Sequence, residues 1–186
     1  MPSIIQADQL KSADGVTTYL NSGTLSNLTF PAGSVIYADS FSFTSTGANS
    51  DPGTNWTNTS LTITVPSATI AKISKVFINV FNTMYVHKAA SAATASTRIL
   101  RTVNSVDTEI CRTNLLGHHD STGPAKIAPN ASMSAMDTSL GSSSHDHVYK
   151  VQYRSDHANY SDAIFYHGKQ NHTDYPIVNI SVLGIV

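Results

Sequence analysis

The segment NWTNTSLTITVP carries the clearest two-residue period in the chain, and this period constrains the fold more than any other feature. Leu61, Ile63 and Val65 alternate with Thr62 and Thr64. Successive side chains of a strand point to opposite faces of a sheet, so the pattern predicts a strand with one apolar face and one hydroxyl-bearing face. The proline that follows is expected to end this strand.

The segment AKISKVFINVFNTMYVH continues the signal. Val76, Ile78 and Val80 would lie on one face and Phe77 and Phe81 on the other, so both faces of this strand are expected to be covered. Its β-branched and aromatic residues argue against a helix. Further strands are expected in SVIYADSFSF (34–43), TRILRTVN (97–104), SVDTEICRTN (105–114), ASMSAMDTSL (131–140), HVYKVQYRS (147–155), AIFYHG (163–168) and IVNISVLGIV (177–186).

These segments predict an all-β fold. About eight strands and the absence of a long helical pattern indicate a β-sandwich of the jelly-roll type or an open barrel. TRILRTVN and SVDTEICRTN are expected to form a hairpin that turns near Asn104 and Ser105. Charged residues make up only 12% of the chain. Abundant Ser and Thr are therefore expected to keep the surface hydrated, and Thr favours strands.

The closing segment 177–186 is almost entirely apolar, with Asn179 and Ser181 as its polar members. A strand of this kind is expected in the middle of a sheet. A buried chain end is expected close to the core or to a subunit contact, because a free apolar end would aggregate. The sequence therefore predicts an oligomer.

Composition excludes several classes of partner. The formal net charge is −1, so no electrostatic footprint for nucleic acid or for an anionic membrane is expected. No window approaches 18 uninterrupted apolar residues, which argues against membrane insertion. Cys111 is the single cysteine, so no disulfide forms within the chain. PSIIQADQLK is unlike a secretory signal, and we expect the chain to fold in a cytosol.

The first 33 residues differ from the rest because they show no sustained period. They end in FPAG, a turn signal that precedes the first predicted strand. We therefore predict an extended N-terminal arm at residues 1–33 and one β-sandwich domain at residues 34–186.

Several phrases of the chain resemble a known family. LSNLTFPAGSVI, SLTITVPSATIAKISKVFINV, HVYKVQYRS and the closing ISVLGIV are similar to small tail-fibre-like structural proteins of bacteriophages, particularly those of marine and cyanobacterial phages. The resemblance runs through nearly the whole chain. This chain has Gly184 near its end, where the family typically has an acidic residue.

The resemblance implies a homotrimer of jelly-roll heads similar to those of the tumour-necrosis-factor fold. It also implies an N-terminal arm that docks onto the virion. The apolar and aromatic residues of the arm are then the candidates for virion attachment: Ile4, Ile5, Leu10 and Tyr19.

The histidines were considered as metal ligands. On a strand, the spacing of His145 and His147 would send both imidazoles to one face, and three such pairs could meet on a trimer axis. An exposed polar entry to the strand is the favoured interpretation, so no metal is assigned. His118 and His119 are adjacent and would point to opposite faces of an extended chain, which makes a poor chelate.

No catalytic residue is assigned. Ser, His and Asp are abundant, but no G-x-S-x-G turn, H-E-x-x-H helix or P-loop accompanies them, so we expect no enzyme and no cofactor. Cys111 lies inside a predicted strand and is expected to be a packed side chain.

The aromatic residues divide into two groups. Phe77, Phe81 and Tyr149 are expected in the core. A second group near the C-terminus has the composition of a recognition surface for a host glycan or protein. A trimer interface built from the same residues is the favoured alternative, because the terminal strand lies beside them. This receptor or interface group comprises Tyr160, Phe165, Tyr166, Tyr175, His157 and Asn159.

The sequence therefore predicts a non-enzymatic bacteriophage virion protein, assembled in the host cytoplasm. The first hypothesis is a short trimeric tail fibre or spike that contacts the host surface. The alternative is a capsid head decoration (cement) protein at three-fold positions of the shell. A free carbohydrate-binding module is disfavoured by the missing secretion signal. The expected partners are further copies of the chain, a neighbouring tail or major capsid protein, and a host-surface glycan or protein.

Overall fold

The chain divides into two compact units, Met1–Ser34 and Val35–Val186. Each unit is considered by itself. The structure, a computed structural model, describes residues 9–11, 18–21, 24–25, 30–44, 54–82, 84–87, 91–92, 95–115, 119–120, 126–127, 131–141, 144–155, 162–165 and 177–186.

The first unit contains a small antiparallel sheet with the order β1-β2-β3, which the sequence did not predict. Its strands are β1 (Gln9–Lys11), β2 (Thr18–Asn21) and β3 (Thr24–Leu25). Of the candidate attachment residues, Leu10 lies in β1 and Tyr19 in β2, whereas Ile4 and Ile5 lie outside the described residues. Their role in attachment stays a prediction.

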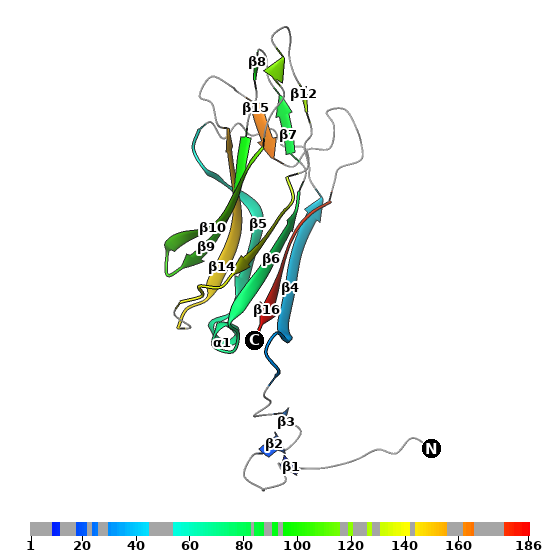
Figure 1. Cartoon of the computed structure of the whole chain (residues 1–186), viewed down its shortest axis with the longest axis vertical. Helices are drawn as coiled ribbons and strands as arrows, with labels where there is room; N and C mark the ends of the chain where they lie inside the picture. The colour runs from blue at the N-terminus through cyan, green and yellow to red at the C-terminus, as the bar shows by residue number, and fades with distance from the viewer. Residues whose placement is uncertain are drawn as a thin grey trace, which may run out of the picture. The chain divides into compact units, whose positions relative to one another are not determined.

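The second unit contains two four-stranded antiparallel sheets, with the orders β10-β9-β14-β5 and β13-β6-β16-β4 (Figure 1). The first sheet consists of β5 (Thr57–Val65), β9 (Ala95–Val103), β10 (Val106–Leu115) and β14 (His147–Ser155). The second consists of β4 (Val35–Thr44), β6 (Lys75–Phe81), β13 (Met133–Asp137) and β16 (Ile177–Ile185).

Shorter elements complete the described part of this unit. A single helical turn, α1 (Ser67–Ile70), follows β5. A three-stranded sheet has the order β12-β7-β15, and a pair joins β11 to β8. These strands are β7 (Met84–His87), β8 (Ser91–Ala92), β11 (His119–Asp120), β12 (Lys126–Ile127) and β15 (Asp162–Phe165). No helix of the described residues is long and apolar enough to cross a membrane.

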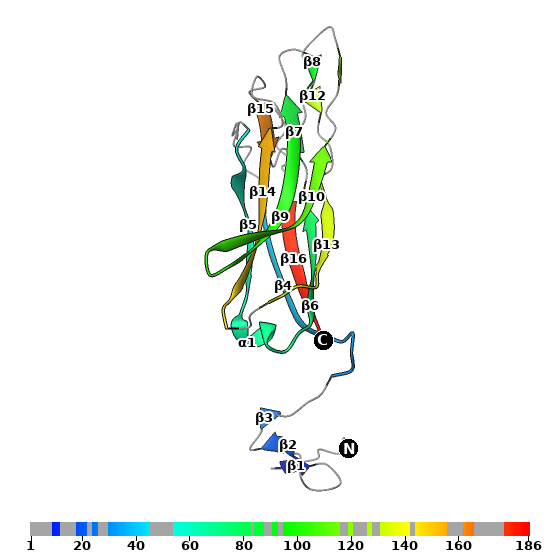
Figure 2. The same cartoon turned by 60° about the vertical axis from the view of Figure 1, so that its left-hand side comes forward.

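The two large sheets form the layers of a β-sandwich (Figure 2). Their inward side chains meet in one apolar cluster, which confirms the all-β sandwich predicted from the sequence. The first sheet contributes Leu61, Ile63, Val65, Ile99, Tyr149, Val151 and Tyr153 to it, and the second contributes Val76, Ile78, Val80, Met133, Val178, Ile180 and Val182.

The alternation predicted for Leu61 to Val65 is confirmed in β5. Leu61 and Val65 have no exposed surface and Ile63 is 4% exposed, whereas Thr62 and Thr64 face solvent. The hairpin is confirmed as well. Asn104 and Ser105 both have positive φ, as the type I′ turn of a two-residue hairpin requires.

The prediction for residues 71–87 is partly wrong. The segment forms two strands, β6 and β7, which belong to different sheets. The inward face of β6 is buried as expected, but Phe77 is half-buried and Phe81 is 48% exposed. Both side chains point away from the partner sheet, and no described part of the chain forms a layer over that outer face. The prediction that Phe77 and Phe81 belong to the core is therefore wrong, whereas Tyr149 is fully buried as predicted.

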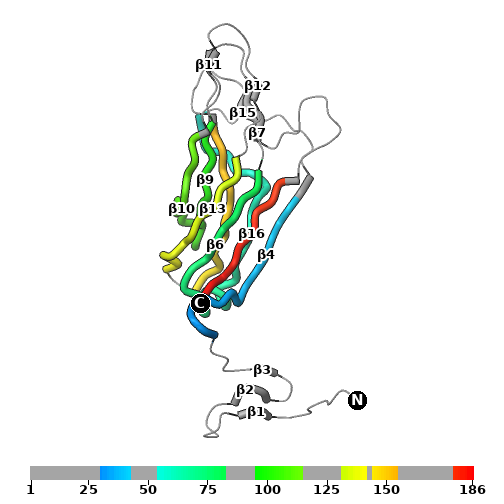
Figure 3. The backbone as a smooth tube through the Cα atoms, turned by 45° about the vertical axis from the view of Figure 1, so that its right-hand side comes forward, coloured from blue at the N-terminus to red at the C-terminus, as the bar shows by residue number. Residues whose placement is uncertain are grey.

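The C-terminal strand lies inside its sheet, as predicted, with β6 on one side and β4 on the other (Figure 3). Val178, Ile180 and Val182 point into the core. A Cβ atom on Gly184 would lie 3.0 Å from Cβ of Tyr37 and 3.1 Å from a methyl group of Ile73. A side chain at this position would therefore require Tyr37 or Ile73 to shift by a few tenths of an ångström.

Replacing Leu61 with alanine tests the register of the sandwich. The change opens a cavity in the core, so we expect the free energy of unfolding to fall by about 2 to 5 kcal/mol. Thr62→Ala, next to it on the outer face, is the matched control and should change stability by no more than about 0.5 kcal/mol. Urea denaturation followed by circular dichroism measures both. Equal losses for the two variants would contradict this register.

Candidate functional site

The outer face of the sheet β10-β9-β14-β5 carries a cluster of arginines around one tryptophan. Trp56, which is half-buried, lies directly before β5. The guanidinium carbons of Arg98, Arg154 and Arg112 lie over its ring, at 4.2, 4.6 and 5.1 Å from the ring centroid. We name these four residues, together with Glu109, the Trp–Arg cluster.

Strand register brings the members of the Trp–Arg cluster together. Arg98 on β9 pairs with Arg112 on β10 and with Gln152 on β14. A bulge shifts the register of β10 between Glu109 and Cys111. Residues three apart on a regular strand face opposite sides, so the bulge is what allows Glu109 and Arg112 to share the outer face.

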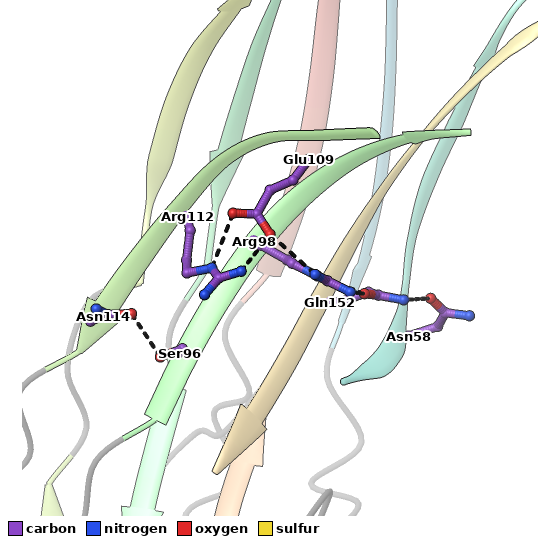
Figure 4. Close-up of polar contacts among 7 residues, drawn as sticks. All are labelled: Asn58, Ser96, Arg98, Glu109, Arg112, Asn114 and Gln152. Atoms are coloured by element: carbon purple, nitrogen blue, oxygen red, sulfur yellow. Dashed lines mark hydrogen bonds and ion pairs between the residues drawn. The ribbon is translucent and has the colours of Figure 1, made fainter. Parts of the chain in front are cut away.

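Hydrogen bonds fix the side chains of this face (Figure 4). Arg98 donates from Nε and Nη2 to Oε1 of Gln152, at 2.8 and 2.6 Å. Gln152, only 7% exposed, donates from Nε2 to Oδ1 of Asn58 at 2.7 Å. Ser96 on β9 lies opposite Asn114 on β10, and Ser96 Oγ donates to Asn114 Oδ1 at 2.9 Å.

Glu109 is the carboxylate of the Trp–Arg cluster. Arg112 donates to both of its oxygens, at 3.1 Å from Nε and 2.7 Å from Nη2, and Arg98 Nη1 reaches Oε2 at 3.1 Å. The hydrogen bond from Arg112 is the main cause that lowers the pKa of Glu109, and Arg98 lowers it further. Three guanidinium groups and one carboxylate thus meet around the ring of Trp56.

Sequence analysis missed this cluster. Its members come from four separate segments, and no local motif joins them. A signal was nevertheless available: Trp56 is the only tryptophan and Glu109 the only glutamate of the chain. Three of the four arginines surround them.

A second polar group lies between the two sheets. Arg101 on β9 forms an ion pair with Asp137 on β13, with Nη1 at 2.9 and 2.8 Å from the two carboxylate oxygens. Tyr149 donates its hydroxyl to Oδ2 of Asp137 at 2.9 Å. Arg101 is 8% exposed and Asp137 is 3% exposed. Burial, together with this carboxylate, raises the pKa of Tyr149. The group connects the sheets inside the sandwich and is structural in character.

A cleft of about 200 Å³ opens between β10 and β13, beside this ion pair. Its charged lining residues are Arg101, Glu109 and Asp137. All three already form ion pairs within the chain. The charged groups that line the cleft are therefore balanced within the chain.

The outer face of the sheet β13-β6-β16-β4 carries a row of apolar side chains. Met136, Phe77, Leu183 and Ala38 lie side by side on β13, β6, β16 and β4, as the strand registers show. Met136 is 45% exposed, and Phe77 and Leu183 are half-buried. We name these four residues the apolar row. It crosses the whole sheet and includes the C-terminal strand.

The aromatic group predicted near the C-terminus cannot be placed. Phe165 is the last residue of β15, and its side chain is not described. Outside the described residues lie Tyr160, Tyr166, Tyr175, His157 and Asn159. Their role as a receptor site or as a trimer interface stays a prediction.

His145 and His147 do not share a face, so this part of the prediction is wrong. His145 lies exposed in the turn before β14, with Nδ1 2.8 Å from Oγ of Ser144. His147 begins β14 and is fully buried, so the favoured interpretation, an exposed polar entry to the strand, is wrong for this residue. Among the described residues, no three His, Cys, Asp or Glu side chains come together as metal ligands. Cys111 is half-buried, and burial raises the pKa of its thiol, as expected of a packed side chain.

The whole chain matches no family model and no curated protein. The chain is similar to the structure of infectious bursal disease virus Gx strain, with a TM-score of 0.36 and 9% identity over 100% of this chain and 42% of that chain. The VP2 subviral particle of infectious bursal disease virus gives a TM-score of 0.32 and 10% identity over 100% of this chain and 42% of that chain.

A bacterial protein gives a TM-score in the same range. Dimeric latent PorU from Porphyromonas gingivalis gives a TM-score of 0.31 and 11% identity, covering 83% of this chain and 13% of that chain. The chain thus spans less than half the length of each of these proteins. The fold assignment rests on the strand pairing described above.

Replacing Asp137 with asparagine tests the buried ion pair. The change leaves the charge of Arg101 without its partner in the sandwich interior, so we expect the free energy of unfolding to fall by about 3 to 5 kcal/mol. Asp39→Asn, on the exposed part of β4, is the control and should cost no more than about 0.5 kcal/mol. Urea denaturation measures both. A small loss for Asp137→Asn would show that the pair is not important for stability.

Proposed function

We propose that the chain is a non-enzymatic structural subunit of a bacteriophage virion, assembled from three jelly-roll heads. The strand order supports the jelly roll. When the strands of the two large sheets are numbered 1 to 8 along the chain, the sheets run 6-3-8-1 and 5-4-7-2. This interleaving of strands between two sheets is the arrangement of a jelly roll, which occurs in viral capsid proteins. The sequence resemblance supports the role in a virion.

The apolar row is the observation that carries the proposal. It places apolar side chains on the outer face of all four strands of one sheet, of which Met136 and Ala38 are exposed and Phe77 and Leu183 are half-buried. Contiguous apolar surface of this kind marks an interface between proteins. Closed symmetry is the usual arrangement of identical subunits, and the sequence resemblance implies three of them. We therefore infer that the rows of three copies meet around a three-fold axis, which removes Phe77 and Met136 from water.

Placing a lysine in the apolar row tests the trimer. Met136→Lys puts a charge into the proposed contact, so we expect monomers, whereas the unmodified chain and Thr64→Lys on the opposite sheet should remain trimers. Thr64 is exposed on β5 and provides the matched change away from the row. Sedimentation equilibrium measures the mass, and circular dichroism should show an unchanged fold. A trimer that survives Met136→Lys would exclude this interface, and a monomeric unmodified chain would exclude the trimer.

A short tail fibre or spike is the preferred location, with residues 1–33 attached to a neighbouring virion protein and the head in contact with the host. An arm of this kind can add a strand to a partner sheet, and three copies strengthen the attachment. The first unit already contains short strands of its own. The alternative, a capsid decoration protein at three-fold positions, uses the same trimer.

Labelling the protein on intact particles separates the two locations. The fibre hypothesis predicts a few copies that are confined to the tail, because a virion has one tail. Electron microscopy with gold-labelled antibodies, together with quantitative mass spectrometry of purified particles, measures position and copy number. Label distributed over the whole capsid would replace the fibre hypothesis by the decoration hypothesis, and particles without the protein would contradict both.

A further inference from the structure

Strand β4 is an edge strand with the features of one that pairs with another chain. It pairs with β16 on one side, and the sheet order places no further strand of the described residues on its other side (Figure 3). It is 10 residues long, contains no proline, and leaves Val35 and Phe41 52% and 41% exposed. Long apolar edges are templates for strand addition, and a charged side chain is a common protection. Asp39 is the only charged residue of β4.

The carboxylate of Asp39 occupies a backbone donor of this edge. Its Oδ1 accepts the N–H of Ser40 at 2.8 Å. In an antiparallel pair, every second residue turns its N–H and C=O groups away from the partner strand. The N–H of Ser40 binds a side chain of its own strand, so it belongs to the groups that point away from β16. A strand that approached β4 from outside would need this N–H for its own ladder.

Tyr37 holds Asp39 from the side of the core. Its hydroxyl oxygen lies 3.3 Å from Oδ2 of Asp39 and 3.4 Å from the carbonyl oxygen of Thr64 on β5, and its single proton can be donated to either. The side chain of Tyr37 packs against the apolar core, which fixes the hydroxyl beside the carboxylate. Burial, and then Asp39, raises the pKa of Tyr37, so the hydroxyl stays a donor. We name Tyr37, Asp39 and the N–H of Ser40 the edge lock.

Strand β5, next to β4, is the edge of the other sheet and is interrupted as well. Its register against β14 shifts between Lys150 and Gln152, where β5 has extra residues. Such a bulge breaks the regular ladder of an edge. Within it, Thr59 Oγ1 accepts the N–H of Leu61 at 3.0 Å. Both edges on this side of the sandwich therefore have a backbone N–H that is bound by a side chain of the same strand.

We propose that the edge lock prevents a second copy of the chain from adding a strand to β4. Asp39 does so by keeping the N–H of Ser40 bonded within its own strand. The consequence for assembly rests on the proposed function, because a free edge would compete with the apolar row for further copies. The lock itself belongs to a single chain. Its failure would therefore leave the trimer and the virion location untouched, since those are tested separately.

Hydrogen exchange at the Ser40 amide tests whether the lock forms. In the unmodified full chain this amide should exchange about tenfold more slowly than in Asp39→Ala, which has lost a hydrogen bond to a charged acceptor. Asp39→Asn keeps an oxygen in the same place and should restore the slow exchange. Mass spectrometry with electron-transfer fragmentation resolves the single amide. Equal exchange in the unmodified chain and in Asp39→Ala would overturn the lock.

Association tests whether the lock protects the edge. Asp39→Ala should form species that are larger than those of the unmodified chain and that grow with protein concentration, whichever oligomer the unmodified chain forms. Asp39→Asn should not. Sedimentation velocity measures size, and circular dichroism checks that each variant is folded. An Asp39→Ala chain that exchanges faster at Ser40 but does not associate would overturn the protective role.

Asp107→Ala is the matched control for loss of a carboxylate. Asp107 lies exposed on β10, which is also an edge strand, but its carboxylate accepts the hydroxyl of Thr102 and pairs with Lys150. Because it holds side chains and not a backbone N–H, its removal should leave the size of the particles unchanged. If Asp107→Ala or Asp39→Asn associated as Asp39→Ala does, charge alone would be the protection, and the assignment of the edge lock would be wrong.

Discussion

The packing of one sheet against the other decides which side chains every strand can expose. Because side chains alternate along a strand, a slip of one residue would move Leu61, Ile63 and Val65 to solvent and place threonines in the core. The apolar core therefore holds each strand in one register. That register in turn determines which outward residues meet on the two outer faces, and both the Trp–Arg cluster and the apolar row follow from it.

Features with a local cause could be predicted from the sequence. The alternation in β5, the turn at Asn104 and Ser105, and the apolar run of β16 each reflect a period or a turn within one segment. Phe77 and Phe81 were misplaced because an apolar residue indicates that a face tends to be covered and does not indicate by what. An apolar face can be covered by another part of the same chain, by a further copy of the chain or by a different protein. The residue type does not distinguish these three cases.

The Trp–Arg cluster could not be predicted because its geometry is non-local. Alternation alone places Glu109 and Arg112 on opposite faces, and only the bulge in β10 brings them together. The contact of Arg98 with Gln152 depends on the pairing of β9 with β14, and β10, β11, β12 and β13 lie between these two strands in the chain. The remaining signal was that the chain has a single tryptophan and a single glutamate. This signal does not indicate where the two residues lie in the fold.

The two outer faces differ in chemistry, and the low overall charge makes the difference plain. Only 12% of the residues are charged, yet three of the four arginines meet the single glutamate on the outer face of one sheet. The outer face of the other sheet carries the apolar row. In the proposed trimer, contact through the apolar rows removes apolar surface from water, and the ion pairs of the Trp–Arg cluster keep their partners because they lie on the other sheet. Assembly would therefore gain from apolar burial without breaking the ion pairs of the cluster.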